Sequence, residues 1–439
     1  MYREKCSIEK QQISLEKTSK FDAILVALAE GTFFKKSWLY IKKKFLFCIK
    51  CIKLFPRFID ELLGTGIRYL ILCKKQVINN RIAFGTFQNS YTCNCKYIAE
   101  KIIEKNIDCE MIFIVNKDVY ENRRKYQIPE QIKLVKRNSL ESFLVLGTSK
   151  IWIDNALNCI WKSIPKKKEQ IYINTWHGSL GIKRLNGNRR WRWIAKHGNN
   201  VIDYFITDSE FEEGVFHNSF WPDVEQLKCG HPRNDIFFDE NKMYELKKKV
   251  YDFYEIDMNV KTVLYAPTFR ENKSDSSAIA IDCEKLKNAL ENKFGGEWQV
   301  ITRLHYHNAN NKKTKNTFQQ TTSIDASKYL DMQELMAAVD IGITDYSSWI
   351  FDFALTKKPA FIYAKDIEKY IDSRGFYYSL NETPFAISDC EEQLFENINL
   401  FDMEEYRRRV ERFLEEKGCY EAGNASEQIV EFICEKIII

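Results

Sequence analysis

The feature that most constrains the fold is an alternation of short apolar runs with helix-like stretches, which begins at Arg81. The apolar runs are rich in β-branched and aromatic residues. They are Ile82–Phe84, Met111–Val115, Ile132–Val135, Ile151–Ile153, Ile171–Ile173 and Tyr204–Ile206, and helix-like stretches such as Lys96–Glu104 and Leu140–Leu146 lie between them. This alternation predicts a mostly parallel sheet with helices on both faces.

The same alternation is repeated later in the chain. The second set of runs is Val263–Tyr265, Val300–Ile301, Ile341–Ile343 and Ala360–Tyr363, with helix candidates Glu284–Asn292, Lys328–Val339 and Ser348–Leu355. A charged, helix-like connector, Asp239–Tyr254, separates the two sets. Since 439 residues exceed one comfortable core, we predict an α/β protein with two doubly wound, Rossmann-like domains, residues 81–240 and 261–439, joined by a helical linker at 241–260. A ligand would then bind in the crevice at the carboxyl ends of the strands.

Residues 1–80 have a different character and are predicted to form a basic, helical N-terminal segment. Lys35–Arg57 contains eight Lys and Arg residues and no Asp or Glu, interleaved with aromatic and aliphatic side chains. Such an amphipathic segment is typical of a helix lying on an anionic membrane surface. The alternative is a helix whose apolar stripe packs on its own protein. The apolar run Ala23–Ala29 is far shorter than the roughly 20 residues that span a bilayer.

Composition excludes some classes of protein. The 13 cysteines are an odd number without framework spacing, which favours a reducing compartment over a disulfide scaffold. The formal charge of +5 is small for this length, and no nucleic acid is predicted as a partner.

An unusual junction follows the predicted strand at Ile341–Thr344. The chain continues as Asp345, Tyr346, Ser347 and Ser348 directly before a helix-like stretch. Ser347 and Ser348 would lie at a helix N-terminus, where free N–H groups and the hydroxyls suit a phosphate. Ordinary N-capping by Ser or Asp is the alternative.

Two further strand ends carry histidines. His177, beside Gly178, follows the strand Ile171–Ile173, and its imidazole is a candidate acceptor for a hydroxyl proton. Arg303 and His305 follow the strand Val300–Ile301 and offer a guanidinium and a ring donor to a diphosphate. His305 and His307 also resemble a metal pair, but no third ligand has suitable spacing, so neither a metal nor another cofactor is predicted.

Six blocks, in order along the chain, resemble the motifs of the CDP-glycerol glycerophosphotransferase (teichoic acid polymerase) family. They are Trp176–Gly178, Gly230–Asp235, Leu264–Arg270, Arg303–His305, Ile343–Ser348 with Phe351–Phe353, and Arg374–Tyr377. Several blocks in the same order are far more specific than any one of them.

The resemblance implies a GT-B-like architecture in a bacterial enzyme that acts peripherally at the cytoplasmic face of the membrane. The first domain would bind the acceptor and the second the CDP-linked donor. The implied reaction transfers glycerol phosphate from CDP-glycerol to an acceptor hydroxyl of a teichoic-acid-like or capsule polymer and releases CMP.

The resemblance also implies roles for individual residues. His177 matches the family's catalytic base, and His305 matches a second essential histidine near the donor diphosphate. Ser347 and Ser348 match contacts to the donor phosphate. The remaining motif positions are Arg303, Thr268, Arg270, Asp345 and Asp352, which are assigned to donor binding, and Gly178, Arg233 and Arg374, whose roles stay open.

The sequence departs from the family pattern on the acceptor side. After Gly178 the family usually continues Thr-Pro-Leu-Lys, whereas this chain has Ser179-Leu180-Gly181-Ile182-Lys183. The family's Pro-Gly-Pro is also absent near Pro384. These departures bear on the identity of the acceptor more than on the donor chemistry. Separately, three alternatives stay open: a CDP-ribitol donor, a GT-B glycosyltransferase that uses a nucleotide sugar, and a membrane-bound scaffold without turnover.

Overall fold

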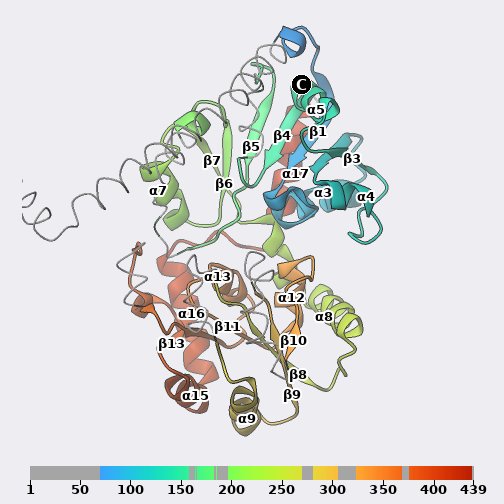
Figure 1. Cartoon of the computed structure of the whole chain (residues 1–439). Coiled ribbons are helices and arrows are strands. Elements are labelled where there is room, and N and C mark those ends of the chain that lie inside the picture. Colours follow the sequence, from blue (N-terminus) through green and yellow to red (C-terminus); the bar gives the residue numbers. More distant parts are fainter. Residues whose placement is uncertain are drawn as a thin grey trace, which may run out of the picture. The chain divides into compact units, whose positions relative to one another are not determined.

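The described part of the chain is built on two parallel β-sheets (Figure 1). The computed structural model describes residues 70–157, 164, 166–181, 184, 196–268, 280–304, 323–367 and 375–437. We call the first sheet with its helices the first lobe and the second sheet with its helices the second lobe.

The strands of the first lobe form a seven-stranded sheet within the described residues, in the order β3-β2-β1-β4-β5-β6-β7. They are β1 (Ile78–Gly85), β2 (Glu110–Val115), β3 (Ile132–Lys136), β4 (Ser149–Asp154), β5 (Ile171–Asn174), β6 (Tyr204–Thr207) and β7 (Glu225–Lys228). All neighbouring pairs run parallel. Strands such as β2 are continuously apolar over their buried residues, here Met111–Val115, because helices cover both faces.

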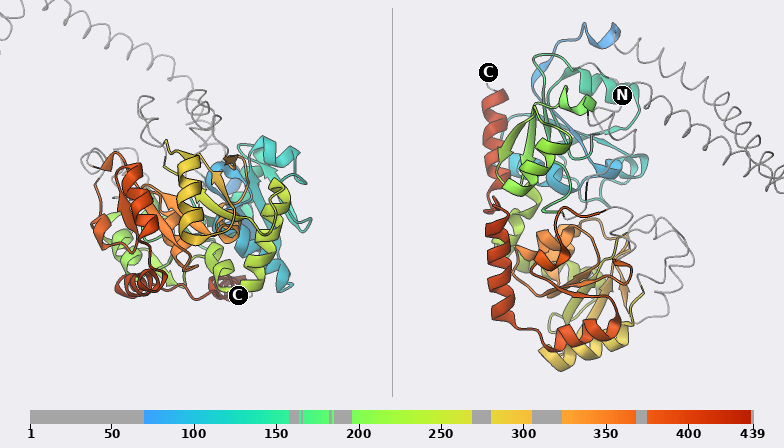
Figure 2. Two further views of the ribbon diagram at one scale, coloured as in Figure 1. Left: turned by 90° about the horizontal axis from the view of Figure 1, so that it is seen from below. Right: turned by 90° about the vertical axis from the view of Figure 1, so that its left-hand side faces the viewer.

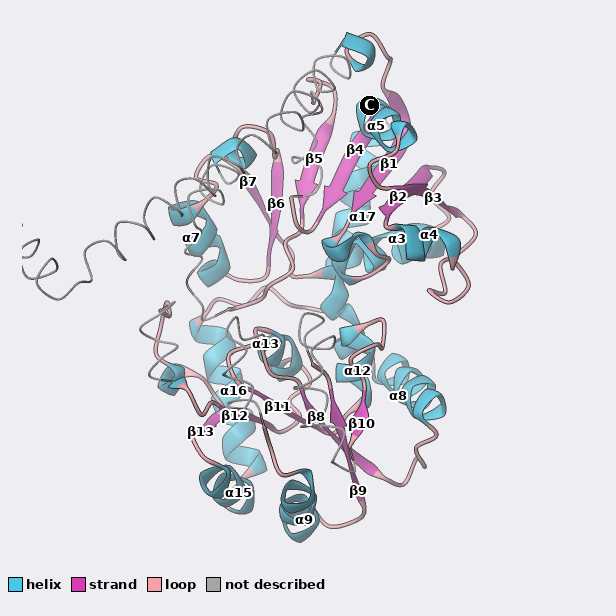
Figure 3. Cartoon of the chain, viewed as in Figure 1, coloured by secondary structure: helices cyan, strands magenta, loops and turns pink. Residues whose placement is uncertain are grey.

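The second lobe has a six-stranded sheet among the described residues, in the order β10-β9-β8-β11-β12-β13, again parallel throughout (Figure 3). Its strands are β8 (Lys261–Tyr265), β9 (Trp298–Thr302), β10 (Ile324–Asp325), β11 (Ile341–Thr344), β12 (Ala360–Tyr363) and β13 (Ala386–Ser388). Both lobes are thus doubly wound, which confirms the predicted fold class.

The described helices connect these strands. The α-helices are α3 (Cys93–Glu104), α4 (Lys117–Glu121), α5 (Leu140–Thr148), α7 (Glu210–Ser219), α8 (Glu240–Tyr254), α9 (Cys283–Phe294), α12 (Met332–Ala338), α13 (Trp349–Ala354), α15 (Glu391–Asn399), α16 (Met403–Glu416) and α17 (Ala425–Ile437), and the 3-10 helices are η1 (Phe87–Asn89), η3 (Pro232–Phe238) and η5 (Leu380–Glu382). Several begin with a side-chain cap, as where Asp239 accepts the N–H of Lys242 at the start of α8. Helix α8 occupies the segment predicted as the helical linker.

Each sheet has a topological switch point where the strand order reverses. It lies between β1 and β4 in the first lobe and between β8 and β11 in the second. In doubly wound sheets, ligands bind outside the carboxyl ends of the strands at such points. The loops that leave these four strands are therefore where a site is expected.

The last helix corrects one domain boundary. We expected all of residues 261–439 in the second domain, but α17 packs on α3 and η3 of the first lobe. Its side chains Ile429, Val430 and Ile433 are buried in the same core as Ile82 of β1. Figure 2 shows α16 beside the second sheet and α17 beside the first. The reason is the apolar face of α17, which completes the first lobe's core.

The N-terminal boundary is also shifted slightly, since β1 begins at Ile78 rather than at Arg81. The basic segment Lys35–Arg57 lies outside the described residues, so its predicted helix stays a prediction. Within the described ranges, no helix is both long enough and apolar enough to cross a bilayer.

Candidate active site

His177 lies at the switch point of the first lobe, in the loop after β5. Its Nδ1 is 2.6 Å from the carbonyl oxygen of Asn155, which follows β4. Its ring stacks on Phe87, which follows β1, with centroids 5.1 Å apart. A carbonyl oxygen only accepts hydrogen bonds, so Nδ1 carries the proton and Nε2 carries the free lone pair. The fold thus fixes the imidazole as a proton acceptor at Nε2.

The surroundings keep this imidazole neutral. Burial lowers the pKa of His177 from 6.5 to about 4, and the positive charge of Arg233 acts in the same direction. The hydrogen bond to the Asn155 carbonyl opposes this shift because it favours the protonated ring. At neutral pH the ring is therefore uncharged, and the lone pair of Nε2 is not occupied by a proton.

Ser347 and Ser348 lie at the switch point of the second lobe, between β11 and α13, and both are half-buried. Helix α13 has six residues, and the Ser348 side chain does not cap it. A short helix has a smaller dipole than we expected, which leaves the two hydroxyls as the main donors of this junction.

The loop that carries His177 reaches this junction. A Cβ atom on Gly181 would lie 3.6 Å from the Cβ of Ser348. The Leu180 carbonyl accepts the Tyr378 hydroxyl at 2.6 Å, and Arg184 Nε donates to the Phe376 carbonyl at 2.8 Å. The segment after His177 therefore lies against the second lobe beside the paired serines.

Thr268 and Asp345 join the two strand ends that flank this junction. The Thr268 N–H and hydroxyl each donate to Asp345 at 2.9 Å. Asp345 also accepts the N–H of Tyr346 at 2.5 Å. These bonds fix the loop after β8 to the loop after β11; direct donor contacts by either residue stay a prediction.

Arg233, from η3, connects the two lobes behind His177. Its Nη2 donates to the Gly178 carbonyl at 2.7 Å, and its Nε donates to Asp352 of α13 at 3.0 Å. Both side chains of this ion pair are almost fully buried. Burial alone would lower the pKa of Arg233, but Asp352 raises it above its ordinary range. Asn234 also donates to Asp352, at 3.0 Å.

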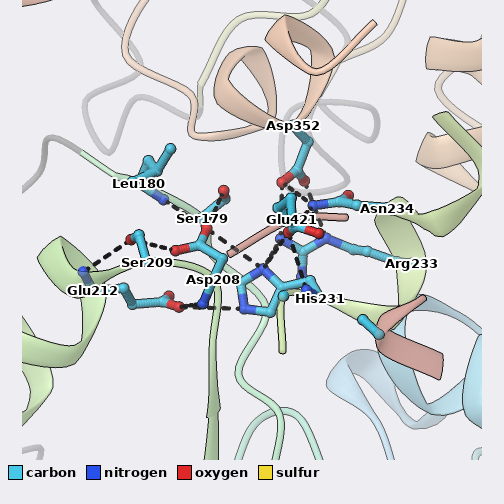
Figure 4. A network of polar contacts seen from close by, with 12 residues as sticks. Ser179, Leu180, Asp208, Ser209, Glu212, His231, Arg233, Asn234, Asp352 and Glu421 are labelled. Carbon is cyan, nitrogen blue, oxygen red and sulfur yellow. Dashed lines mark hydrogen bonds and ion pairs between the residues drawn. The ribbon is translucent and has the colours of Figure 1, made fainter. Parts of the chain in front are cut away.

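A buried polar network surrounds His231 next to this pair (Figure 4). Its ring lies 3.7 Å from Asp208 and 3.4 Å from Glu212. Asp208 accepts the Ser179 hydroxyl at 2.5 Å. Burial raises the pKa of Asp208 to about 6 and that of Glu212 to about 7, and burial lowers the pKa of His231 to about 4. Asp208 and Glu212 therefore hold a proton more readily than exposed carboxyls, whereas His231 holds one less readily than an exposed imidazole.

Asp208, His231 and Glu421 place possible metal-ligand atoms within 4.8 Å of one another. Oε1 of Glu421 already accepts the N–H of His231 at 3.0 Å and the Asn234 amide at 2.8 Å, and Oδ2 of Asp208 accepts the Ser179 hydroxyl at 2.5 Å. The Arg233 guanidinium is 3.3 Å from His231 Nδ1. A cation beside a guanidinium would be repelled, so this arrangement suits hydrogen bonding better than metal binding.

The other predicted site residues divide into two groups. Arg303 directly follows β9, as predicted, and its Nη1 donates to the Tyr329 carbonyl at 2.9 Å. His305, Arg270, Arg374 and Lys183 lie outside the described residues, and their roles stay predictions.

Sequence reasoning missed several residues that shape the site. Phe87 and Asn155 hold the His177 ring, yet neither lies in a recognised motif. Their positions after β1 and β4 were the available signal, because both flank the switch point. Asp208, Glu212 and Glu421 were missed as well. Asp208 and Glu212 are four positions apart, but only the fold brings them to His231 and to Glu421, which is 190 positions from His231.

The family whose sequence profile matches the chain is described as CDP-glycerol:poly(glycerophosphate) glycerophosphotransferase, and the match covers residues 67–435. The chain belongs to this family. The family assignment made from the six motif blocks is thereby confirmed.

Known relatives agree with this assignment. The chain is 29% identical over 363 residues to a teichoic acid poly(glycerol phosphate) polymerase of Bacillus spizizenii, which covers 78% of this chain and 88% of that protein. It is 29% identical over 383 residues to a polymerase of the same description from Bacillus subtilis, covering 82% of this chain but 50% of that longer protein. Teichoic acid enzymes named for ribitol phosphate also match, at 25–29% identity.

A solved structure supports the fold. A histidine-to-asparagine variant of the wall teichoic acid polymerase TagF, soaked with CDPG, superposes with a TM-score of 0.72 at 26% identity. The match covers 91% of this chain and 98% of that one. The GT-B-like fold is therefore confirmed.

Proposed function

We propose that this chain transfers glycerol phosphate from CDP-glycerol to an acceptor hydroxyl and releases CMP. One observation carries the proposal most directly: His177 is held at the switch point with Nδ1 bonded to a carbonyl and Nε2 free to accept a proton. Family membership supports CDP-glycerol as the donor, and the geometry of His177 supports this residue as the base.

The proposed reaction is a direct displacement at the glycerol-bearing phosphorus. The acceptor hydroxyl gives its proton to Nε2 of His177 while its oxygen bonds to that phosphorus. The bond from the phosphorus to the bridging oxygen breaks, and CMP leaves with the electron pair. Positioned donors that meet the developing negative charge are a main source of catalysis in phosphoryl transfer.

The second lobe would provide those donors. The Cβ of Ser348 lies close to Gly181 in the loop of His177, and the hydroxyls of Ser347 and Ser348 are proposed to contact the donor phosphate. Arg303 and His305 are proposed to contact the diphosphate from the end of β9. A bound diphosphate would also raise the low pKa of His177 by stabilising the imidazolium, which would make it a stronger base once donor is present.

The acceptor is proposed to be a growing teichoic-acid-like or capsule polymer, because the curated relatives are named for poly(glycerol phosphate) synthesis.

We also propose that the chain works at the cytoplasmic face of the membrane, with the basic segment Lys35–Arg57 on anionic lipid. Replacing Lys42, Lys43 and Lys44 with glutamate in the full chain should reduce co-sedimentation with anionic vesicles. Unchanged co-sedimentation would contradict the lipid contact.

The alternative donor is CDP-ribitol, because relatives named for ribitol phosphate also match. Incubating the protein with CDP-glycerol, CDP-ribitol or a UDP-sugar, each with a lipid-linked acceptor, separates the candidates. Release of CMP from CDP-glycerol supports the proposal. Release of CMP from CDP-ribitol alone would show that the transferred group is ribitol phosphate, and release of UDP would indicate a glycosyltransferase.

A further inference from the structure

We propose that Arg233 is a positioning residue that holds the loop of His177 against helix α13 and so sets the distance between the imidazole and the start of that helix. This inference rests on the proposed function, because it concerns how the same site is assembled.

The contacts of Arg233 reach both halves of the site through one rigid group. Nη2 donates to the carbonyl of Gly178, the residue after His177, at 2.7 Å. Nε and Nη2 donate to the two oxygens of Asp352 at 3.0 and 3.2 Å. Asp352 lies four residues after Ser348, one turn along the same short helix. A planar guanidinium thus fixes the loop and the helix at one separation.

The rest of the network holds Arg233 in place. His231 Nδ1 accepts from Nη2 at 3.3 Å, and Asn94 accepts the main-chain N–H of Arg233 at 3.2 Å. Asn94 in turn donates to the carbonyls of Thr175 and Trp176, on the other side of His177. Both ends of the histidine loop are therefore tied to the segment that carries Arg233.

Arg233 acts at a distance from the chemistry in this arrangement. Its side chain is 2% exposed and its donors are directed to protein acceptors. It is therefore expected to influence turnover through the placement of His177, and a displacement of about 1 Å in such a group can cost about 100-fold in rate.

The test compares Arg233→Lys and Asp352→Asn with wild type by CMP release from CDP-glycerol. A lysine ammonium is a single point charge and cannot span Gly178 and Asp352 together. For Arg233→Lys we expect kcat to fall by about 10- to 100-fold, while KM for CDP-glycerol changes by less than about 3-fold because Arg233 does not contact the donor. Asp352→Asn should lower kcat similarly, and the KM criterion applies to Arg233→Lys alone because Asp352 is also a predicted donor-binding residue. In a His177→Ala background, Arg233→Lys should cause no further loss.

The matched control is Asp340→Asn. Asp340 also lies in the second lobe and pairs with a lysine, Lys247, at 2.9 Å. It precedes β11, at the end of the strand away from the site. This variant should keep kcat near the wild-type value.

The outcomes separate the two proposals. If wild type releases no CMP, the proposed function fails. If wild type is active and folded Arg233→Lys keeps its kcat, or loses as much in the His177→Ala background as in wild type, the positioning role is wrong. If Arg233→Lys and Asp352→Asn both lose the cooperative thermal transition, the pair is structural and the proposal is overturned.

Discussion

Gly181 and Ser348 approach one another across the two lobes: a Cβ atom on Gly181 would lie 3.6 Å from the Cβ of Ser348. Gly181 is four residues after His177, and Ser348 directly precedes helix α13. The loop that follows His177, the proposed base, therefore contacts the segment that carries Ser347 and Ser348, whose hydroxyls are proposed to bind the donor. This contact brings the proposed base and the proposed donor-binding hydroxyls into one site.

The first prediction concerns that glycine. In Gly181→Ala the new methyl group would lie 2.8 Å from the Ser179 carbonyl oxygen, so the loop must shift. We expect kcat/KM for CDP-glycerol to fall by about 10-fold, since the shift displaces the loop beside the donor site. CMP release at varied donor concentration measures this effect.

Gly214→Ala provides the control for this variant. Gly214 lies inside α7, and an added Cβ there meets nothing within 4 Å. Alanine should raise stability by about 0.5–1 kcal/mol and leave kcat/KM unchanged. Equal activity of the two glycine variants would show that the close approach at Gly181 does not matter for donor use.

The sequence was informative where local patterns determine the outcome. Buried parallel strands are continuous apolar runs, so β8, β11 and β12 were predicted with correct positions. Edge strands such as β7 (Glu225–Lys228) lack this signal and were missed. The placement of α17 was also unpredictable, because an apolar helix face alone does not indicate which lobe it packs on.

The site shows the same division. His177 and the serine pair were found because each directly follows a strand. The hydrogen bond from His177 to Asn155 and the ion pair between Arg233 and Asp352 each join residues that are at least 22 positions apart in the sequence. No local pattern encodes such partners, so geometry was needed to assign the Nε2 lone pair and the role of Arg233.

A second prediction concerns pH-dependent stability. Burial raises the pKa of Glu212 from 4.5 to about 7 in the folded protein. The folded state then binds more protons than the unfolded state between these values, so Glu212 makes stability fall as pH rises from about 4.5 to about 7. Glu212→Gln removes this effect and should be more stable than wild type at pH 8.5, by on the order of 1–3 kcal/mol.

Urea unfolding at pH 5 and pH 8.5 measures this difference. Glutamine keeps an oxygen that can accept the Asp208 N–H, which Glu212 binds at 2.9 Å. Glu213→Gln, at the next position, is the control and should not flatten the pH dependence. A Glu212→Gln protein with the same pH dependence as wild type would show that this carboxyl does not titrate in the network.

A third prediction concerns the bond between the loops after β8 and β11. Thr268→Val keeps the shape of the side chain but removes the hydroxyl that donates to Asp345 at 2.9 Å. Loss of a hydrogen bond to a carboxylate should cost about 1.5–3 kcal/mol of stability. Thr268→Ser retains the hydroxyl and should lose less, as thermal unfolding would show. A Thr268→Val protein as stable as wild type would show that the hydroxyl bond to Asp345 does not stabilise the folded state.

The fourth prediction tests His177 itself. His177→Ala should lower turnover by at least ~100-fold, the lower range for removal of a general base, whereas His217→Ala at the exposed end of α7 should not. Because the pKa of His177 is about 4 in the free protein, the ring stays neutral as pH falls from 8 to about 5, and kcat/KM should show no acid limb near 6.5. A bound diphosphate favours the imidazolium, so the acid limb of kcat should lie at a higher pH than that of kcat/KM. An acid limb at the same pH in both profiles would mean that donor binding does not raise the pKa of His177, and near-wild-type turnover by His177→Ala would remove this residue as the base.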